Sequence, residues 1–84
     1  MLQADERGYM LDCDKLKAGF RKSGSVSGNH SHDVHEILYL IQGEAEITVD
    51  TETQTIVSPA RIDFPAGSRH TVVAITDIIF LEDR

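Results

Sequence analysis

The feature that most constrains the fold of this chain is the spacing of its histidines. All four histidines of the 84-residue sequence lie in two short segments, 30–36 and 65–70, and the first segment also holds Glu36. Imidazole nitrogens and a carboxylate oxygen suit a first-row transition metal. His30 and His32 share one face only where the backbone is extended, because a helix would point them to nearly opposite sides. The spacing therefore predicts a metal site built on β-strands.

Strand geometry decides which residues can reach one ion. Side chains on the same face of a strand lie about 6.6–7 Å apart, so His30 and His32 can lean toward a common metal. On an uninterrupted strand Glu36 would lie about 13 Å from His32, which is too far. We therefore expect the chain to bend at Asp33 and Val34, so that Glu36 becomes the first inward residue of the next strand.

His70 is the fourth candidate ligand. It follows the turn sequence at 65–67 and starts another strand, in which His70, Val72 and Ala74 are expected to face inward. The predicted site therefore draws on two separate segments of the chain.

Three neighbouring residues have alternative interpretations. His35 has the opposite parity to Glu36 and is predicted to point away from the site. Asp33 is a substitute carboxylate, although a turn residue more often contacts solvent. Glu36 is either a ligand or a surface carboxylate, and an unpaired charge on the inward side of an apolar strand would be costly.

Most of the chain is predicted to form short strands. Residues 15–21 alternate so that Leu16, Ala18 and Phe20 share one face and basic residues share the other, as in a half-buried strand. Further strands are expected at 55–57, 61–64, 70–75 and 78–81. About seven short strands without a helical period predict an all-β fold, an antiparallel sandwich or barrel.

The most clearly patterned pair of strands is expected at 36–41 and 45–50, joined as a hairpin by a turn at 42–44. Strand parity predicts a small, mainly apolar pocket. The residues predicted to face inward are Leu38, Leu40, Ile47, Val49, Phe64 and Val72. Arg69 is the only basic side chain expected near the site, and a role for it in binding an anionic substrate stays open.

Apolar residues on the outward side predict a homodimer. Ile37, Tyr39 and Ile41 are expected to point away from the barrel, and the segment 78–81 is also apolar on both faces. A monomer would leave this surface in water. Residues 1–9 are weakly patterned and are expected to be either a disordered tail or an arm exchanged between subunits.

Composition excludes several function classes. A chain of this length forms one domain, residues 1–84, and has little apolar surface to bury, so a metal or a partner subunit is expected to add stability. The formal net charge of −6 argues against nucleic-acid binding. No apolar stretch approaches the roughly 20 residues of a membrane span. The single cysteine, Cys13, is expected to be a half-buried apolar side chain, and a cytoplasmic location is expected.

The spacing of these residues resembles that of the cupins. The first cupin motif has a Gly, five residues, His-x-His, three or four residues, a Glu, six residues and a Gly. The matching residues are Gly24, His30, His32, Glu36 and Gly43. The second motif resembles residues 65–70, with Pro59 in place of its leading Gly and Ala74 in place of its trailing Asn.

The resemblance implies a small antiparallel β-barrel or jelly roll with a divalent transition metal (Mn, Fe, Ni, Zn or Cu) near one mouth. The implied metal ligands are His30, His32, Glu36 and His70. Such a site suits a metal-dependent enzyme of the dioxygenase or isomerase type that acts on a small oxygen-bearing molecule. The alternative is a non-catalytic module that binds or senses a small ligand, and the sequence identifies no catalytic residue beyond the ligands.

Overall fold

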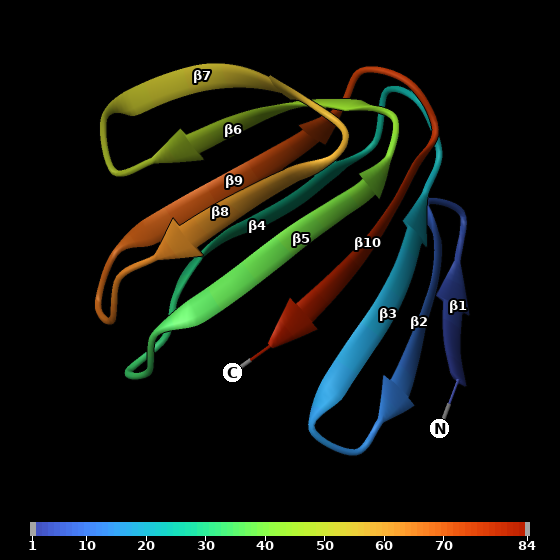
Figure 1. Ribbon diagram of the computed structural model, residues 1–84, viewed down its shortest axis with the longest axis horizontal. Helices are drawn as coiled ribbons and strands as arrows, with labels where there is room; N and C mark the ends of the chain where they lie inside the picture. Colours follow the sequence, from blue (N-terminus) through green and yellow to red (C-terminus); the bar gives the residue numbers. More distant parts are fainter. Residues whose placement is uncertain (1, 84) are drawn as a thin grey trace.

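The structure is a computed structural model that describes residues 2–83, apart from the side chains of Asn29 and His30. The regular structure in this range consists of antiparallel β-strands (Figure 1). In chain order the strands are β1 (Leu2–Asp5), β2 (Gly8–Cys13), β3 (Leu16–Arg21), β4 (Val26–Ser31), β5 (Glu36–Gln42), β6 (Glu44–Val49), β7 (Glu52–Val57), β8 (Ala60–Phe64), β9 (Arg69–Ala74) and β10 (Ile78–Asp83). Within these residues, no helix has the length and apolar character needed to span a bilayer.

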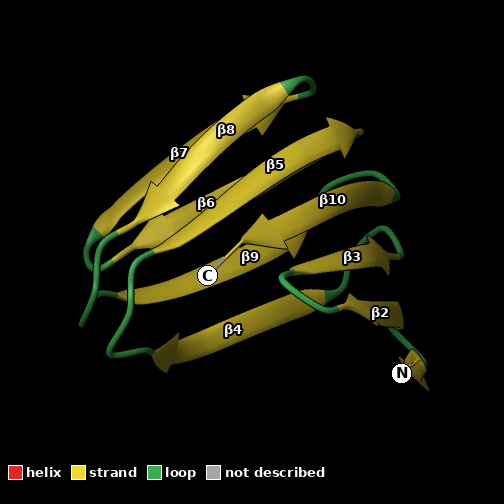
Figure 2. Cartoon of the chain, turned by 60° about the horizontal axis from the view of Figure 1, so that its bottom comes forward, coloured by secondary structure: helices red, strands yellow, loops and turns green. Residues whose placement is uncertain are grey.

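The strands form two sheets that pack as separate layers (Figure 2). One sheet has six strands in the order β1-β2-β3-β10-β5-β8, and the other has four in the order β4-β9-β6-β7. From β3 onward, most connections carry the chain from one sheet to the other, as in a jelly roll. The predicted all-β jelly-roll fold is therefore confirmed, with more strands than the sequence predicted.

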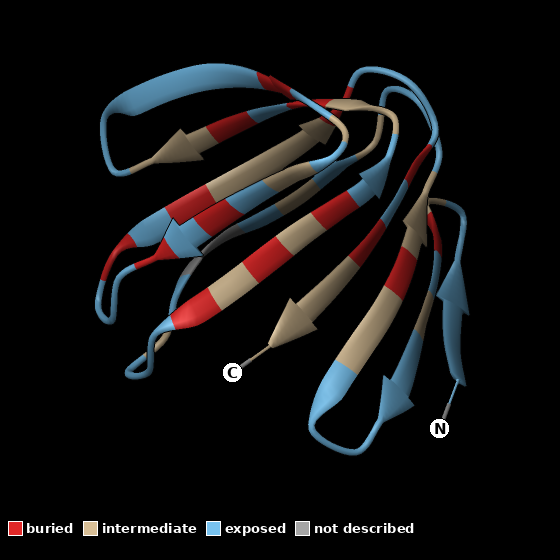
Figure 3. Ribbon diagram, in the orientation of Figure 1, coloured by how far each residue is buried: buried red, intermediate tan, exposed pale blue. Residues whose placement is uncertain are grey.

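One apolar core fills the space between the sheets. Along β5, buried Glu36, Leu38 and Leu40 alternate with residues that reach the outer surface (Figure 3). The core consists of Leu38, Leu40, Ala45, Ile47, Ile56, Ile62, Phe64, Ala74, Ile78 and Phe80. Of the apolar residues predicted to face inward on β5, β6, β8 and β9, Val49 and Val72 are only partly buried and pack against this core, and the others belong to it.

The predicted hairpin between β5 and β6 is wrong. β5 pairs with β8 and β10 in the six-stranded sheet, whereas β6 pairs with β7 and β9 in the four-stranded sheet. Gly43 forms the corner between the sheets at a φ of +102°, and a Cβ there would overlap the carbonyl oxygen of Asp77. The amide of Ser58 donates to the Gly43 carbonyl at 3.0 Å, and the Gly43 amide donates to Ser58 Oγ at 3.1 Å. Contacts with distant loops therefore replace the local hairpin.

Strand β3 alternates as predicted, but its buried face is the opposite one. Gly19 is buried, whereas Ala18 and Phe20 are only partly buried on the outer side. A Cβ at Gly19 would overlap the Phe80 ring and lie 2.6 Å from Met10 Sδ, so glycine makes room for these larger inward side chains. Because Gly19 has no side chain, the hydrophobicity pattern of the sequence does not indicate that its face of β3 is the buried one. One consequence is that the basic residues of β3 face the interior.

The N-terminal residues form the edge of the six-stranded sheet. β1 pairs with β2, and β2 pairs with β3 of the same chain. In this structure residues 2–9 are thus strands and a tight turn, and exchange of this segment between subunits stays a prediction. Cys13, predicted to be half-buried, is exposed because it ends β2 at the tip of the β2–β3 hairpin. The cytoplasmic location expected from cysteine usage also stays a prediction.

Candidate metal centre

The first half of the site is built by the bend between β4 and β5. His32 follows the last residue of β4, and Asp33 and Val34 form the predicted bend. Glu36 then opens β5 as its first inward residue and is only 3% exposed. The prediction that the chain bends so that Glu36 returns toward His32 is therefore confirmed.

The second half comes from the turn between β8 and β9. The turn is closed by hydrogen bonds from the Ser68 amide and Ser68 Oγ to the Pro65 carbonyl, at 3.0 and 2.6 Å. The Gly67 amide donates to the His32 carbonyl at 2.7 Å, which joins this turn to the bend that carries His32. His70 then follows as a buried residue of β9. Main-chain hydrogen bonding thus brings the two sequence motifs together.

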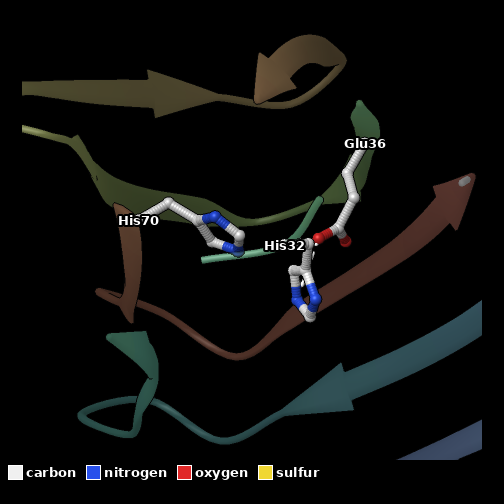
Figure 4. Close-up of side chains that lie close together, drawn as sticks. All are labelled: His32, Glu36 and His70. Carbon is white, nitrogen blue, oxygen red and sulfur yellow. Dashed lines mark ion pairs between the residues drawn. The ribbon is translucent and has the colours of Figure 1, made fainter. Parts of the chain in front are cut away.

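His32, Glu36 and His70 converge in space (Figure 4). One ligand atom from each residue lies within 4.8 Å of the others. His32 Nε2 is 3.0 Å from Glu36 Oε1, and the rings of His32 and His70 have centroids 5.9 Å apart. Three potential metal ligands from two separate segments of the chain therefore surround one point.

Packing fixes the position of His70. Its ring stacks on Phe64, with centroids 4.1 Å apart and planes 15° from parallel. Phe64 is itself buried in the core at 3% exposure. Because a buried aromatic ring holds one face of the imidazole, rotation of the ring is restricted, and its edge remains directed toward the cluster.

The donor set fits a divalent transition metal. Two imidazole nitrogens and a carboxylate oxygen are ligands that Mn, Fe, Ni, Zn and Cu ions accept. Donors that bind one ion at about 2.1 Å and at right angles lie about 3 Å apart, which matches the 3.0 Å between His32 Nε2 and Glu36 Oε1. A cation at this point would also offset the cost of burying the Glu36 carboxylate.

The other sequence candidates have different outcomes. The backbone of His30 pairs with that of His70 in the β4–β9 register, but the His30 side chain lies outside the described residues, so its role as a ligand stays a prediction. His35 is exposed, with Nε2 3.1 Å from Asp63 Oδ1. Hydrogen bonds from Arg61, and then from His35, hold the pKa of Asp63 below its ordinary value. Asp33 is exposed in the bend.

A cavity of about 200 Å³ lies beside Glu36 and His70. Of the residues predicted to form apolar walls, Leu38, Phe64 and Val72 line this cavity, and Met10 and Phe80 complete its apolar lining. The cavity is smaller than the roughly 300–1,000 Å³ of pockets that hold drug-sized ligands. The site is therefore suited to a small molecule.

The cavity also has polar walls that the sequence analysis missed. Arg7, Arg21 and Glu82 line it, whereas Arg69 is exposed and is not among the described lining residues. The expectation that Arg69 is the only basic side chain near the site is therefore wrong. The sequence pattern places Arg21 on the outer face of β3, whereas in the structure that face is the inward one. Arg7 reaches the cavity from the β1–β2 turn. Only the alternation in β3, taken in the correct phase, could have indicated Arg21.

Gly28 lies in the cavity wall where β4 passes close to His70. Its φ is +99°, and a Cβ there would lie 2.6 Å from the carbonyl oxygen of His70. We expect Gly28→Ala to lower the free energy of unfolding by more than the roughly 1–2 kcal/mol that left-handed backbone costs a residue with a Cβ. Urea denaturation measures the loss.

The matched control for this substitution is Gly24→Ala. Gly24 has a φ of +85°, but a Cβ there would meet nothing within 4 Å. Only the backbone strain is then common to the two variants, so Gly28→Ala should be the less stable of the two. Equal losses would mean that the close approach to His70 does not matter.

Comparisons with solved structures agree with this fold. A conserved protein of unknown function from Streptococcus pyogenes is 28% identical with a TM-score of 0.77, over 80% of this chain and 59% of its own. An RmlC-like cupin from Shewanella frigidimarina is 18% identical with a TM-score of 0.84, over 98% of this chain and 79% of its own. Oxalate decarboxylase from Bacillus subtilis is 21% identical with a TM-score of 0.83, over 98% of this chain and 26% of its own.

The first two of the most similar structures belong to longer proteins. The chain spans 59% of the streptococcal protein and 27% of the capsular polysaccharide assembling protein CapF from Staphylococcus aureus. A search of curated proteins found no match. In a comparison with protein families, residues 19–81 match the family described as Cupin domain. With this match over most of its length and a two-sheet jelly roll around the His32–Glu36–His70 cluster, the chain belongs to the cupin domain family.

Proposed function

We propose that this cupin domain binds a divalent transition metal through His32, Glu36 and His70, with His30 as the fourth ligand, and uses it to bind a small oxygen-bearing molecule. The observation that carries the proposal is the convergence of three ligand atoms within 4.8 Å of one another. The backbone register, in which His30 pairs with His70, supports the assignment of His30.

The imidazole and carboxylate ligands limit the metal to a group of transition-metal ions. Mn, Fe, Ni, Zn and Cu all accept imidazole and carboxylate, and the oxalate decarboxylase of similar fold has Mn(II) centres. Once bound, such an ion supplies Lewis-acid or redox activation of an oxygen donor. Phe64 and Val72 form apolar walls of the cavity beside Glu36 and His70.

Two uses of the site follow from different observations. Glu82 places a carboxylate in the cavity wall, and a group able to accept a proton there favours a metal-dependent enzyme of the dioxygenase or isomerase type. The small volume and the short loops around it favour the alternative, a non-catalytic domain that binds or senses a small ligand. Oxygen consumption with bound Fe or Cu would support the oxygenase, whereas tightly held Zn or Ni without turnover would support the binding domain.

Elemental analysis tests the proposal most directly. We expect protein purified without added metal to contain close to one equivalent of a transition metal per chain. Glu36→Gln keeps the shape of the side chain but removes the charge, and it should lower this content at least tenfold. If wild type and Glu36→Gln contain equally little metal, even after incubation with Mn, Fe, Ni, Zn or Cu, the proposed function is wrong.

We also propose that the domain forms a homodimer through the outer face of the six-stranded sheet. Several large apolar side chains on this face are exposed, including Tyr9, Leu11, Ile41 and Ile79 at 47, 41, 52 and 41%. The pairing of β5, β10, β3 and β2 makes these positions one continuous surface. A contiguous apolar surface of this kind is typical of a subunit interface.

Substitution of three neighbouring residues of β5 tests the dimer. We expect Ile37→Thr, Tyr39→Thr and Ile41→Thr together to halve the mass measured by sedimentation, because they place hydroxyl groups across the apolar surface. The control is Val57→Thr, at a residue that is 61% exposed on the four-stranded sheet. An unchanged dimer mass in the triple variant would reject this interface.

A further inference from the structure

The cavity beside the metal cluster has a second polar end. Arg21, Arg7 and Ser27 line it together with Glu36 and His70. Arg21 comes from β3, Ser27 from β4, and Arg7 from the β1–β2 turn. The turn and most of the N-terminal hairpin lie outside residues 19–81, the part of the chain that matches the cupin family. Part of this end of the cavity therefore comes from residues outside the family match.

The strand register places Arg21 near His70. Arg21 Nε donates to Ser27 Oγ at 3.1 Å, and Ser27 pairs with Val72 in the β4–β9 register. Val72 and His70 are neighbours on the inward side of β9, so their Cα atoms lie about 6.6–7 Å apart. The guanidinium of Arg21 and the imidazole of His70 thus line one cavity, with Ser27 and Val72 between them in the strand register.

Arg21 retains binding capacity for an anion. Its hydrogen bonds among the described residues go to two neutral acceptors, Ser27 Oγ and the carbonyl of Phe20. Burial, followed by the nearby charge of Arg7, lowers the pKa of Arg21 below its ordinary value. Arg7 itself is engaged by Asp5 at 2.8 Å. The carboxylates of Asp5 and Glu82 lie near enough to favour the charged form of Arg21. The remaining N–H donors of its guanidinium can bind a further carboxylate in a bidentate manner.

The charges of the cavity make this binding depend on the metal. Arg7 and Arg21 share the cavity wall with the carboxylates of Glu36 and Glu82, and Arg7 is also paired with Asp5. A divalent ion at the cluster would add two positive charges and leave this region with an excess of positive charge. A bound anion would offset that excess. Phe64, Val72 and Phe80 contribute apolar lining to the same cavity.

We propose that the cavity binds a small aliphatic dicarboxylate, or an acid with another oxygen donor a few atoms from its carboxylate, with one end at the metal cluster and the other at Arg21. This inference rests on the proposed metal-binding function. In this arrangement Arg21 binds the second carboxylate of the ligand, and Arg7 adds positive charge at the same end of the cavity. A monocarboxylate of equal length would meet only one of the two ends.

Calorimetry with zinc-loaded protein tests the assignment. The probes are succinate and butyrate, which have four carbons each and differ in the second carboxylate. We expect succinate to bind more tightly than butyrate, and Arg21→Gln to weaken succinate binding by about tenfold to a hundredfold, the usual range for losing a hydrogen-bonded charge. Arg21→Lys should restore part of the affinity. The matched control is Arg61→Gln, which removes an exposed arginine from β8 and should change nothing.

Zinc content measured on the same samples separates the two proposals. If Arg21→Gln holds as much zinc as wild type and binds succinate equally well, the role of Arg21 is wrong while metal binding stands. Equal affinity of wild type for succinate and butyrate would lead to the same conclusion. If wild type holds no zinc, the titration is repeated with Mn, Fe, Ni and Cu, and if it holds none of these ions both this inference and the proposed function fail. If Arg21→Gln does not fold, Arg21→Lys and the two probes on wild type still decide the outcome.

Discussion

Replacing His70 with alanine is expected to abolish the thermal stabilisation that a bound metal gives to this domain. An ion at 100 times its dissociation constant stabilises a folded protein by about 2.7 kcal/mol. In a domain of 60–100 residues each kcal/mol raises Tm by roughly 4–8 °C. Wild type should therefore gain about 10–20 °C in Tm on addition of the metal, and His70→Ala should gain almost nothing. Thermal unfolding with and without metal measures both increments.

The comparison within each variant separates metal binding from packing. His70→Ala also loses the stacking contact with Phe64, so its Tm without metal is expected to fall as well. His35→Ala is the control, because His35 is exposed and contacts Asp63 rather than the cluster. It should keep the full metal-dependent increment. The assignment of His70 as a ligand would be contradicted if His70→Ala gained as much from metal as His35→Ala does.

The second large effect is expected from the core. Leu40 is 1% exposed and lies two inward positions along β5 from Glu36. Truncation of a buried leucine to alanine usually costs about 2–5 kcal/mol. A loss of this size removes much of the stability of a small domain, so Leu40→Ala should be largely unfolded at 37 °C without metal. Urea denaturation monitored by circular dichroism measures the change.

Val57→Ala is the control for the core substitution, because Val57 is 61% exposed on β7. Its midpoint should stay within error of wild type. Added metal should rescue part of the loss in Leu40→Ala, since the ligands remain in place and the ion binds only the folded state. Equal midpoints for Leu40→Ala and Val57→Ala would contradict the core described above.

The metal cluster could be predicted in some detail because its geometry is local. His32 and Glu36 are separated by one bend, and the strand repeat limits where each side chain can point. His70 was found from a turn signal followed by a strand. The structure places these three residues together. The same reasoning failed for Arg21, because the phase of β3 is set by Gly19, whose missing side chain gives no hydrophobic signal.

Pairing between strands could not be predicted in the same way. The sequence from 36 to 50 has the pattern of a hairpin, yet β5 and β6 belong to different sheets. Each of these strands buries one face in the same core, and Gly43 allows the corner because it fits against Asp77 and Ser58. The alternation of apolar and polar residues predicts which side chains of a strand face inward. A β5–β6 hairpin and the observed placement of the two strands in different sheets are equally compatible with that alternation.

The amino-acid sequence alone determined the all-β class, the inward residues of most strands and the set of candidate ligands. These properties depend on backbone periodicity over a few residues. Only the tertiary structure decided which strands are neighbours, which face of β3 is buried and that Arg21 shares a cavity with His70. Those outcomes depend on packing between segments far apart in the chain, where the volume of a side chain such as Phe80 decides what can lie opposite it.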